Sequence, residues 1–331
     1  MSSAPMDYLD LLKNVKDKIK AAQYKAVLSV NKEMILLYWG IGADIIKNAT
    51  WGNKFIENLS KDIQSDFPKL KGYSVRNLKY MQKFANEFPD YEIVQEVLAQ
   101  LTWYHIIKLM DKVKGYETRL WYAQKAIQNG WSTSVMSLQI ESDLFSRQAL
   151  SDKTTNYGDR LPSPQSDLAI ETLKDPYVFD FITMSEDLKE REIERQLTRN
   201  IAKLLLELGT GFAFMGNQFH LEVAGQDFYV DMLFYNVKLR CYVVVELKIG
   251  AFRPEYAGKV NFYLSVIDDQ LKSSEDNPSI GIILCKDKNK LVAEYTLKDM
   301  TKPIGVAEFK LFESVTKEIE EKLYRLESDD E

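Results

Sequence analysis

The sequence predicts a mixed α/β domain in its second half, preceded by an all-helical N-terminal domain. Up to about residue 147, apolar residues recur at the i, i+3, i+4, i+7 spacing of amphipathic helices. After residue 210, apolar runs of strand length are interspersed with helical patterns, which is typical of an α/β core. With 331 residues, the chain is long enough for two domains that each bury a core of their own.

The composition indicates a globular protein of a reducing compartment. Hydrophobic residues make up 45% and charged residues 28% of the chain, which argues against wholesale disorder. Cys241 and Cys285 each lie in an apolar run and are expected in the core. With two histidines and no CxxC pair, neither a zinc centre nor a histidine-based triad is expected. The chain shows no signal-peptide pattern and no apolar run of membrane-spanning length, so we expect a cytoplasmic protein without membrane contact.

The most informative segment of the helical half is 71–84. Ser74 is placed to cap a helix whose inward face holds Leu78 and Met81. The outward face is basic and polar, and the candidate nucleic-acid contacts on it are Arg76, Asn77, Lys79 and Lys83. A short helix, a glycine-bearing turn and a basic second helix are what helix-turn-helix DNA readers use. A solvated basic face on an ordinary helical bundle is the alternative, and the sequence leaves both open.

The segment 151–168 is polar, contains proline and glycine, and shows no hydrophobic period. Such a stretch is typical of an interdomain linker. We therefore predict a helical domain over 1–150, a linker over 151–168, and an α/β domain over 169–331.

The elements of the second half follow from pattern and punctuation. A helix is expected from Ser185, as N-cap, to Leu208, with Gly209 as its end. Three strands then alternate with short turns, and a crossover helix precedes a fully apolar strand. In order, the expected elements are strands at 212–223, 227–236 and 241–249, a helix over Pro254–Leu271, a strand over Ile280–Cys285, a further helical piece, a short strand over Gly305–Leu311, and a C-terminal helix.

Two of these strands carry charge inside apolar runs. Asp231 lies in the first, and Glu246 and Lys248 lie in the second. Burying a carboxylate is costly unless something pairs with it, and a metal cation is the usual partner. Strand alternation places Glu246 and Lys248 on one face, and pairing of the two strands would bring Asp231 to them. The pattern suits metal-dependent phosphodiester hydrolysis. The alternative is a solvent-facing aspartate with an exposed ion pair of little energetic value.

Asp231 followed by Glu246-Leu247-Lys248 resembles the PD-(D/E)XK nuclease superfamily. The sequence around these residues is similar to the YhcG-type family, a bacterial group of RecB-related nucleases with an N-terminal domain of undefined function. The resemblance covers nearly the whole chain. Its motifs are Tyr38-Trp39-Gly40-Ile41-Gly42, Gly72-Tyr73-Ser74-Val75-Arg76-Asn77-Leu78, Leu101-Thr102-Trp103-Tyr104-His105, Gly130-Trp131-Ser132, the run from Leu206 to Phe214, Asp231-Met232-Leu233-Phe234-Tyr235, Glu246-Leu247-Lys248-Ile249-Gly250, Pro254-Glu255-Tyr256-Ala257-Gly258 and the run from Ile280 to Lys286.

The resemblance implies a restriction-endonuclease-like core of the order αβββαβ and a metal-dependent DNA endonuclease. Asp231, Glu246 and the carbonyl of Leu247 would bind Mg²⁺ or Mn²⁺. Lys248 would orient or deprotonate the metal-activated water that attacks phosphorus. On the preceding helix, Glu194 is the candidate for an additional metal contact or for holding a water, and Glu192 is the fallback. A solvated helix face is the alternative for Glu194.

One position departs from the family pattern. RecB-like nucleases commonly place a glutamine and a tyrosine four residues apart on the crossover helix, where this chain has Lys259 and Tyr263. Lys259 would contact the scissile phosphate or be an ordinary surface lysine. The departure keeps open a protein that docks on nucleic acid without cutting it.

The resemblance also implies biological expectations. DNA is the expected partner, and homodimers are common in the superfamily. The expected biological role is in bacterial DNA repair, recombination or mobile-element defence. A further alternative is a helical half that assembles with other proteins rather than with DNA.

Overall fold

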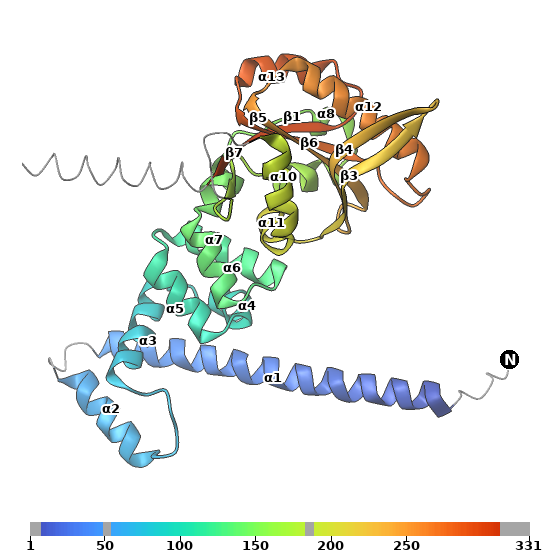
Figure 1. Cartoon of the computed structure of the whole chain (residues 1–331). Helices are drawn as coiled ribbons and strands as arrows, with labels where there is room; N and C mark the ends of the chain where they lie inside the picture. Colours follow the sequence, from blue (N-terminus) through green and yellow to red (C-terminus); the bar gives the residue numbers. More distant parts are fainter. Residues whose placement is uncertain (1–7, 49–53, 183–188, 312–331) are drawn as a thin grey trace, which may run out of the picture. The chain divides into compact units, whose positions relative to one another are not determined.

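The computed structural model of the protein describes residues 8–48, 54–182 and 189–311. The chain divides into two compact units, Met1–Ser142 and Asp143–Glu331. None of the helices within these described ranges is both long enough and apolar enough to cross a membrane. Figure 1 shows a first unit of helices and a second unit built around a sheet, which confirms the predicted fold class.

The described part of the first unit is all helical. It opens with the long helix α1 and continues with shorter helices. These elements are α1 (Tyr8–Lys47), α2 (Phe55–Asp66), α3 (Val75–Glu87), α4 (Tyr91–Glu96), the 3-10 helix η2 (Leu98–Gln100), α5 (Trp103–Lys112), α6 (Tyr116–Asn129) and α7 (Thr133–Glu141).

Helix α3 packs closely against α1. A Cβ atom at Gly42 of α1 would overlap the carbonyl oxygen of Met81 on α3, so only glycine permits this approach. Ser74 caps α3 by accepting a hydrogen bond from the Asn77 N–H at 3.3 Å, as expected. Leu78 and Met81 are fully buried, which confirms the predicted inward face.

His105 of α5 has a structural role. Its ring is buried, Thr102 Oγ1 lies 2.8 Å from Nδ1, and the Trp131 carbonyl oxygen lies 3.0 Å from Nε2. Burial lowers the pKa of this histidine, with partial opposition from the Trp131 carbonyl.

A mixed seven-stranded sheet organises the second unit. Its order is β1-β7-β6-β5-β4-β3, with β2 also paired to β7. The neighbours β3, β4 and β5 run antiparallel, and β5, β6 and β7 run parallel. The strands are β1 (Thr154–Thr155), β2 (Tyr177–Phe179), β3 (Phe212–Val223), β4 (Gln226–Asn236), β5 (Cys241–Ala251), β6 (Ile280–Asp287) and β7 (Ile304–Leu311).

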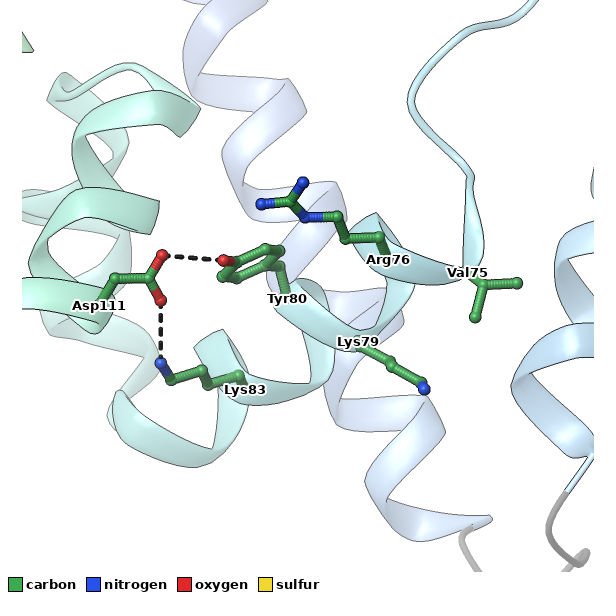
Figure 2. A pocket seen from close by; sticks show the side chains of 6 residues that line it. All are labelled: Val75, Arg76, Lys79, Tyr80, Lys83 and Asp111. Atoms are coloured by element: carbon green, nitrogen blue, oxygen red, sulfur yellow. Dashed lines mark hydrogen bonds and ion pairs between the residues drawn. The ribbon is translucent and has the colours of Figure 1, made fainter.

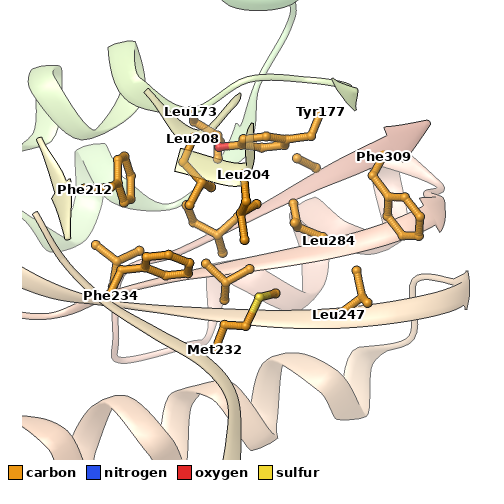
Figure 3. Packing of buried hydrophobic residues seen from close by; sticks show 14 of the residues in the cluster. Leu173, Tyr177, Leu204, Leu208, Phe212, Met232, Phe234, Leu247, Leu284 and Phe309 are labelled. Atoms are coloured by element: carbon orange, nitrogen blue, oxygen red, sulfur yellow. The ribbon is translucent and has the colours of Figure 1, made fainter. Parts of the chain in front are cut away.

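Helices cover both faces of this sheet. On one face α10, α11 and residues from 157–182 pack onto Met232, Leu247 and Leu284. Figure 3 shows Leu204 and Leu208 of α11 in this cluster. On the other face α12 and α13 pack onto Val244 and Ile283. Strands buried on both faces read as continuous apolar runs, which is why β5 and β6 are recognisable in the sequence. The helices of this unit are the π-helix η3 (Ser146–Leu150), α8 (Tyr157–Arg160), α9 (Gln165–Thr172), α10 (Glu190–Arg199), α11 (Ile201–Leu208), α12 (Pro254–Gln270) and α13 (Lys290–Lys298).

The segment predicted as a linker, 151–168, is instead part of the second unit. It contributes β1 and α8 and begins α9. Tyr157 is fully buried, and its hydroxyl donates to the Gly281 carbonyl at 2.8 Å. Asn156 donates its side-chain amide to the Leu297 and Lys302 carbonyls, both at 3.1 Å. The polar residues of this segment therefore hold it to distant backbone, which a local composition cannot reveal.

The single helix expected from Ser185 to Leu208 is also two helices where it is described. Ser185 lies outside the described residues, and α10 begins at Glu190. The helix breaks at Asn200, whose side chain donates to the Gln196 carbonyl at 3.0 Å. A side-chain amide that bonds local backbone competes with helix continuation. Gly209 ends α11 at φ 109°, as predicted, and the expected C-terminal helix lies beyond the described residues.

A buried ionic cluster joins η3 to α11. Glu207 pairs with Arg147 and with Lys174, whose Nζ is 3.6 Å from Glu207 Oε2. Glu207 Oε1 also accepts the Val178 N–H at 2.9 Å. Burial lowers the pKa of Lys174 to about 8, although Glu207 acts in the opposite direction. Arg147 is thus a buried ion-pair partner.

Candidate active site

The strands β4 and β5 bring the predicted charged residues together. Their paired residues include Met232 opposite Val245, and Asp231 and Glu246 each lie one position beyond this pair. Asp231 Oδ2 accepts the Leu247 N–H at 3.0 Å. The alternation of side chains along β5 puts Glu246 and Lys248 on the same face. The structure therefore forms the expected patch, and the solvent-facing alternative for these residues is wrong.

Glu246 is the electrostatic centre of the patch. It is fully buried, and its Oε1 lies 2.6 Å from Lys259 Nζ and 3.1 Å from Lys248 Nζ. Its other oxygen, Oε2, is buried and has no hydrogen-bond partner among the described residues. A buried carboxylate oxygen without a partner is costly, so this atom is placed to accept a ligand.

Asp231 responds to the same surroundings. Burial and the Glu246 carboxylate together raise the pKa of Asp231 to about 6, although the Leu247 N–H partly opposes them. Two carboxylates held together away from water repel each other, and a divalent cation between them would relieve this repulsion. The donor set of Asp231, Glu246 and backbone oxygen therefore fits Mg²⁺ or Mn²⁺. The site offers two carboxylates. No group of three or more His, Cys, Asp or Glu side chains that could hold a metal occurs in the described ranges.

Lys248 is held among acidic groups. Its Nζ lies 2.9 Å from Glu190 Oε2 and 3.0 Å from the Leu247 carbonyl oxygen. Burial lowers the pKa of Lys248, but Glu246, Glu190 and Asp231 outweigh it and hold the pKa above its ordinary value. A lysine that remains protonated orients a water and offsets negative charge, and it cannot accept a proton.

Lys259 belongs to the site. It reaches Glu246 from α12 and lies over the Tyr263 ring, with Nζ 5.2 Å from the ring centroid. The Tyr263 hydroxyl donates to the Tyr229 carbonyl at 2.8 Å, which ties α12 to β4 beside the patch. The Lys259 side chain is 41% exposed, and its contact with the scissile phosphate stays a prediction.

Of the two glutamates considered on α10, Glu194 faces the site. It is 6% exposed and accepts hydrogen bonds from Gln218 Nε2 at 2.8 Å and Asn217 Nδ2 at 3.4 Å. Glu192 instead pairs with Arg195 at 2.8 Å on the helix surface.

Asp231, Lys248, Lys259 and Glu194 line one cavity of about 370 Å³, and the fully buried Glu246 is not part of its lining. Sequence reasoning missed several of its members. Glu190 precedes Glu194 by four residues on α10, so helical spacing would have placed both on one face. Gln218 has φ 46° beside an irregularity of β3, and no sequence signal reveals that position. The complete lining is Glu190, Arg191, Glu194, Gln218, Asp227, Phe228, Tyr229, Asp231, Leu247, Lys248, Lys259 and Tyr263.

A second pocket, of about 650 Å³, lies on the outward face of α3 (Figure 2). Its basic side chains are Arg76, Lys79 and Lys83. Lys83 Nζ lies 3.2 Å from Asp111 Oδ1, and the Tyr80 hydroxyl donates to Asp111 Oδ2 at 2.8 Å. Arg76 lies over the Tyr80 ring at 5.7 Å. Arg76 and Lys79 are the exposed cations of this face.

Asn77 is not part of this pocket, contrary to its predicted outward position. Its amide donates to the Gly72 carbonyl and accepts the Trp103 Nε1–H at 2.8 Å. Both ends of the amide are therefore used to hold the α3 turn to α5.

Known proteins resemble the chain along most of its length. The model of the YhcG PDDEXK nuclease domain matches residues 170–324, and the model of the DUF1016 N-terminal domain matches residues 14–147. A curated relative, "Putative nuclease YhcG" of Escherichia coli strain K12, is 28% identical over 347 residues. That alignment covers 94% of this chain and 92% of the relative.

Solved structures resemble only part of the chain. A repair endonuclease from Pyrococcus abyssi is 14% identical with a TM-score of 0.25, over 39% of this chain and 49% of that one. EndoMS in a complex with double-stranded DNA is 15% identical with a TM-score of 0.28, over 40% and 48%. The match thus spans about half of each of these chains. The two domain models together match most of the sequence in the expected order, which confirms the resemblance of the chain to the YhcG-type family of PDDEXK nucleases.

Proposed function

We propose that this protein is a metal-dependent endonuclease that hydrolyses phosphodiester bonds in DNA. The observation that carries the proposal is the buried Oε2 of Glu246, which has no hydrogen-bond partner among the described residues. Lys248 and Lys259 contact the other oxygen of this carboxylate and line the cavity together with Asp231. Asp231, Glu246 and the Leu247 carbonyl would hold Mg²⁺ or Mn²⁺. Such a cation supplies a water of lowered pKa and offsets the negative charge that builds on the phosphate.

The other side chains have positioning and electrostatic roles in this proposal. Lys248, kept protonated by its acidic neighbours, orients the attacking water and stabilises charge on phosphorus. Lys259 and Arg191 present cations to the phosphate oxygens at the mouth of the cavity. Glu194 fixes the Gln218 amide and so shapes the wall opposite the carboxylates. We extend the proposal to a cytoplasmic bacterial enzyme of DNA repair, recombination or mobile-element defence, which acts as a homodimer where two strands are cut.

The function is tested by incubating the purified protein with Mg²⁺ or Mn²⁺ and linear, nicked, branched or single-stranded DNA. We expect cleavage of at least one form, lost on chelation and in Asp231→Ala. Circular dichroism and thermal unfolding establish that the variant is folded. Failure to cut every form, or equal cutting by Asp231→Ala, would refute the proposal.

A second function is favoured by one contact. The Lys259 ammonium lies 2.6 Å from Glu246 Oε1, on a carboxylate that a metal would need. If Lys259 keeps this place, the nuclease fold binds the phosphate backbone without hydrolysing it. Salt-dependent DNA binding that is indifferent to metal and leads to no cleavage would support this alternative.

We also propose that the α3 face binds DNA phosphates through Arg76 and Lys79. Each of Arg76→Ala and Lys79→Ala is then expected to weaken binding equally across DNA sequences and to reduce the salt slope of binding by about 1. Fluorescence anisotropy over a range of salt concentrations measures both effects. Lys114→Ala, an exposed lysine in the loop after α5, is the matched control. A salt slope unchanged in both α3 variants would show that this face is exposed to solvent and does not contact DNA phosphates.

A further inference from the structure

An exposed aromatic residue lies next to the catalytic carboxylates. Tyr229 precedes Asp231 by two residues on β4, so the two positions lie about 7 Å apart along the strand. Tyr229 is 47% exposed and lines the cavity with Asp231. Its hydroxyl has no hydrogen-bond partner within the described part of the chain, so the fold does not use this end of the ring.

A second ring supports the first. His220 is the residue directly opposite Tyr229 on β3, and the two ring centroids are 5.4 Å apart at an angle of 37°. Asp227 Oδ1 lies 2.7 Å from His220 Nε2 and so fixes the imidazole. The Tyr229 backbone is fixed in turn by the Tyr263 hydroxyl. The two rings are therefore held in place before any ligand arrives.

The charges around the rings differ from those at the carboxylates. Asp227 and Glu222 face each other across the hairpin at the ring end, so a phosphate is disfavoured there. Lys248 and Lys259 lie at the other end, beside Glu246. A ligand with a flat neutral group at one end and a phosphate at the other matches this division. A single nucleotide, with its base on Tyr229 and its phosphate near the lysines, has a flat neutral group and a phosphate at about this separation.

We propose that Tyr229, backed by His220, is a stacking platform for a nucleobase next to the scissile phosphate. This inference rests on the proposed nuclease function and narrows its substrate. A base can stack on the ring only when it has left a duplex stack, so the preferred substrate carries an unpaired base at this point. Single strands, ends and branch points meet the condition, and an uninterrupted duplex does not.

The test uses a short single-stranded oligonucleotide that carries a fluorescent purine analogue quenched by stacking. In the presence of a chelator, wild-type protein and Tyr229→Phe are expected to quench the analogue. Tyr229→Ala is expected to lose the quenching and to bind roughly 10- to 100-fold more weakly, the usual range for one stacked base. Tyr295→Ala removes an equally large exposed tyrosine, 68% exposed on α13 and away from the cavity, and should change neither reading.

The outcomes separate this inference from the nuclease proposal. Metal-dependent cleavage of single strands that Tyr229→Ala leaves unchanged, together with absent quenching, overturns the platform and retains the nuclease. Quenching that depends on Tyr229 without any cleavage supports the platform and refutes the nuclease. Equal affinity for a fully paired duplex, with the same dependence on Tyr229, would overturn the preference for an unpaired base.

Discussion

A Glu246→Gln variant is expected to cut DNA about 100- to 10,000-fold more slowly than the wild-type protein, a range typical of losing one essential charged group in catalysis. The amide keeps the shape of the side chain but removes the charge that Oε2 would offer a cation. It also removes the anion that holds Lys248 and Lys259 in place. Single-turnover cleavage in Mg²⁺ measures the rate, and calorimetric titration with Mn²⁺ measures the expected loss of metal binding.

Glu192→Gln is the matched control for this variant. Glu192 carries the same charge but pairs with Arg195 on the surface of α10, so its cleavage rate should stay at the wild-type value. A folded Glu246→Gln protein that cuts at the wild-type rate would exclude Glu246 from the reaction. Retained Mn²⁺ binding in a folded but inactive variant would assign Glu246 to lysine positioning rather than to the metal.

Replacing Glu207 with alanine is expected to destabilise the second unit by about 3–5 kcal/mol, the usual cost of removing one partner of a buried ion pair. The substitution leaves the cations of Arg147 and Lys174 buried, and their side chains are only 6% and 3% exposed. It also leaves the Val178 N–H without its carboxylate acceptor. Because all five tryptophans precede the second unit, urea denaturation followed by circular dichroism, with hydrogen exchange of peptides from residues 143–311, measures the change.

Glu255→Ala serves for comparison, because Glu255 is 63% exposed and its nearest cation, Arg253 Nη1, is 3.8 Å away. A surface pair of this kind contributes about 0–1 kcal/mol. If Glu207→Ala costs no more than Glu255→Ala, the buried cluster does not hold η3 and β2 to α11.

The sequence is sufficient to predict the strands that carry the site. Asp231 and Glu246 lie in the buried apolar stretches of β4 and β5, so they contrast sharply with their neighbours. Gly209 and Ser74 are recognisable because helix ends have local chemical requirements. In all these cases, the signal lies within a few residues of the feature that it predicts.

The features that the sequence did not reveal depend on distant partners. Tyr157 is a core residue because Gly281 accepts its hydroxyl, and the two are 124 positions apart in the chain. Asn77 faces inward because Trp103 and the Gly72 carbonyl take its amide. Glu190 enters the site because Lys248 reaches it from β5. Composition and period describe a residue's own segment, and they cannot specify contacts of this kind.

The outer edge of β7 is completed by strands that come much earlier in the chain. β1 pairs with its first half, where Thr154 lies opposite Val306, and β2 pairs with its second half, where Phe179 lies opposite Leu311. An open strand edge is a template for pairing with another molecule. A protein fragment cut at residue 170, where the nuclease-domain match begins, would lose β1 and expose that template. A fragment that keeps the β7 edge covered must therefore include Thr154 and Thr155. We expect shorter fragments to aggregate more readily.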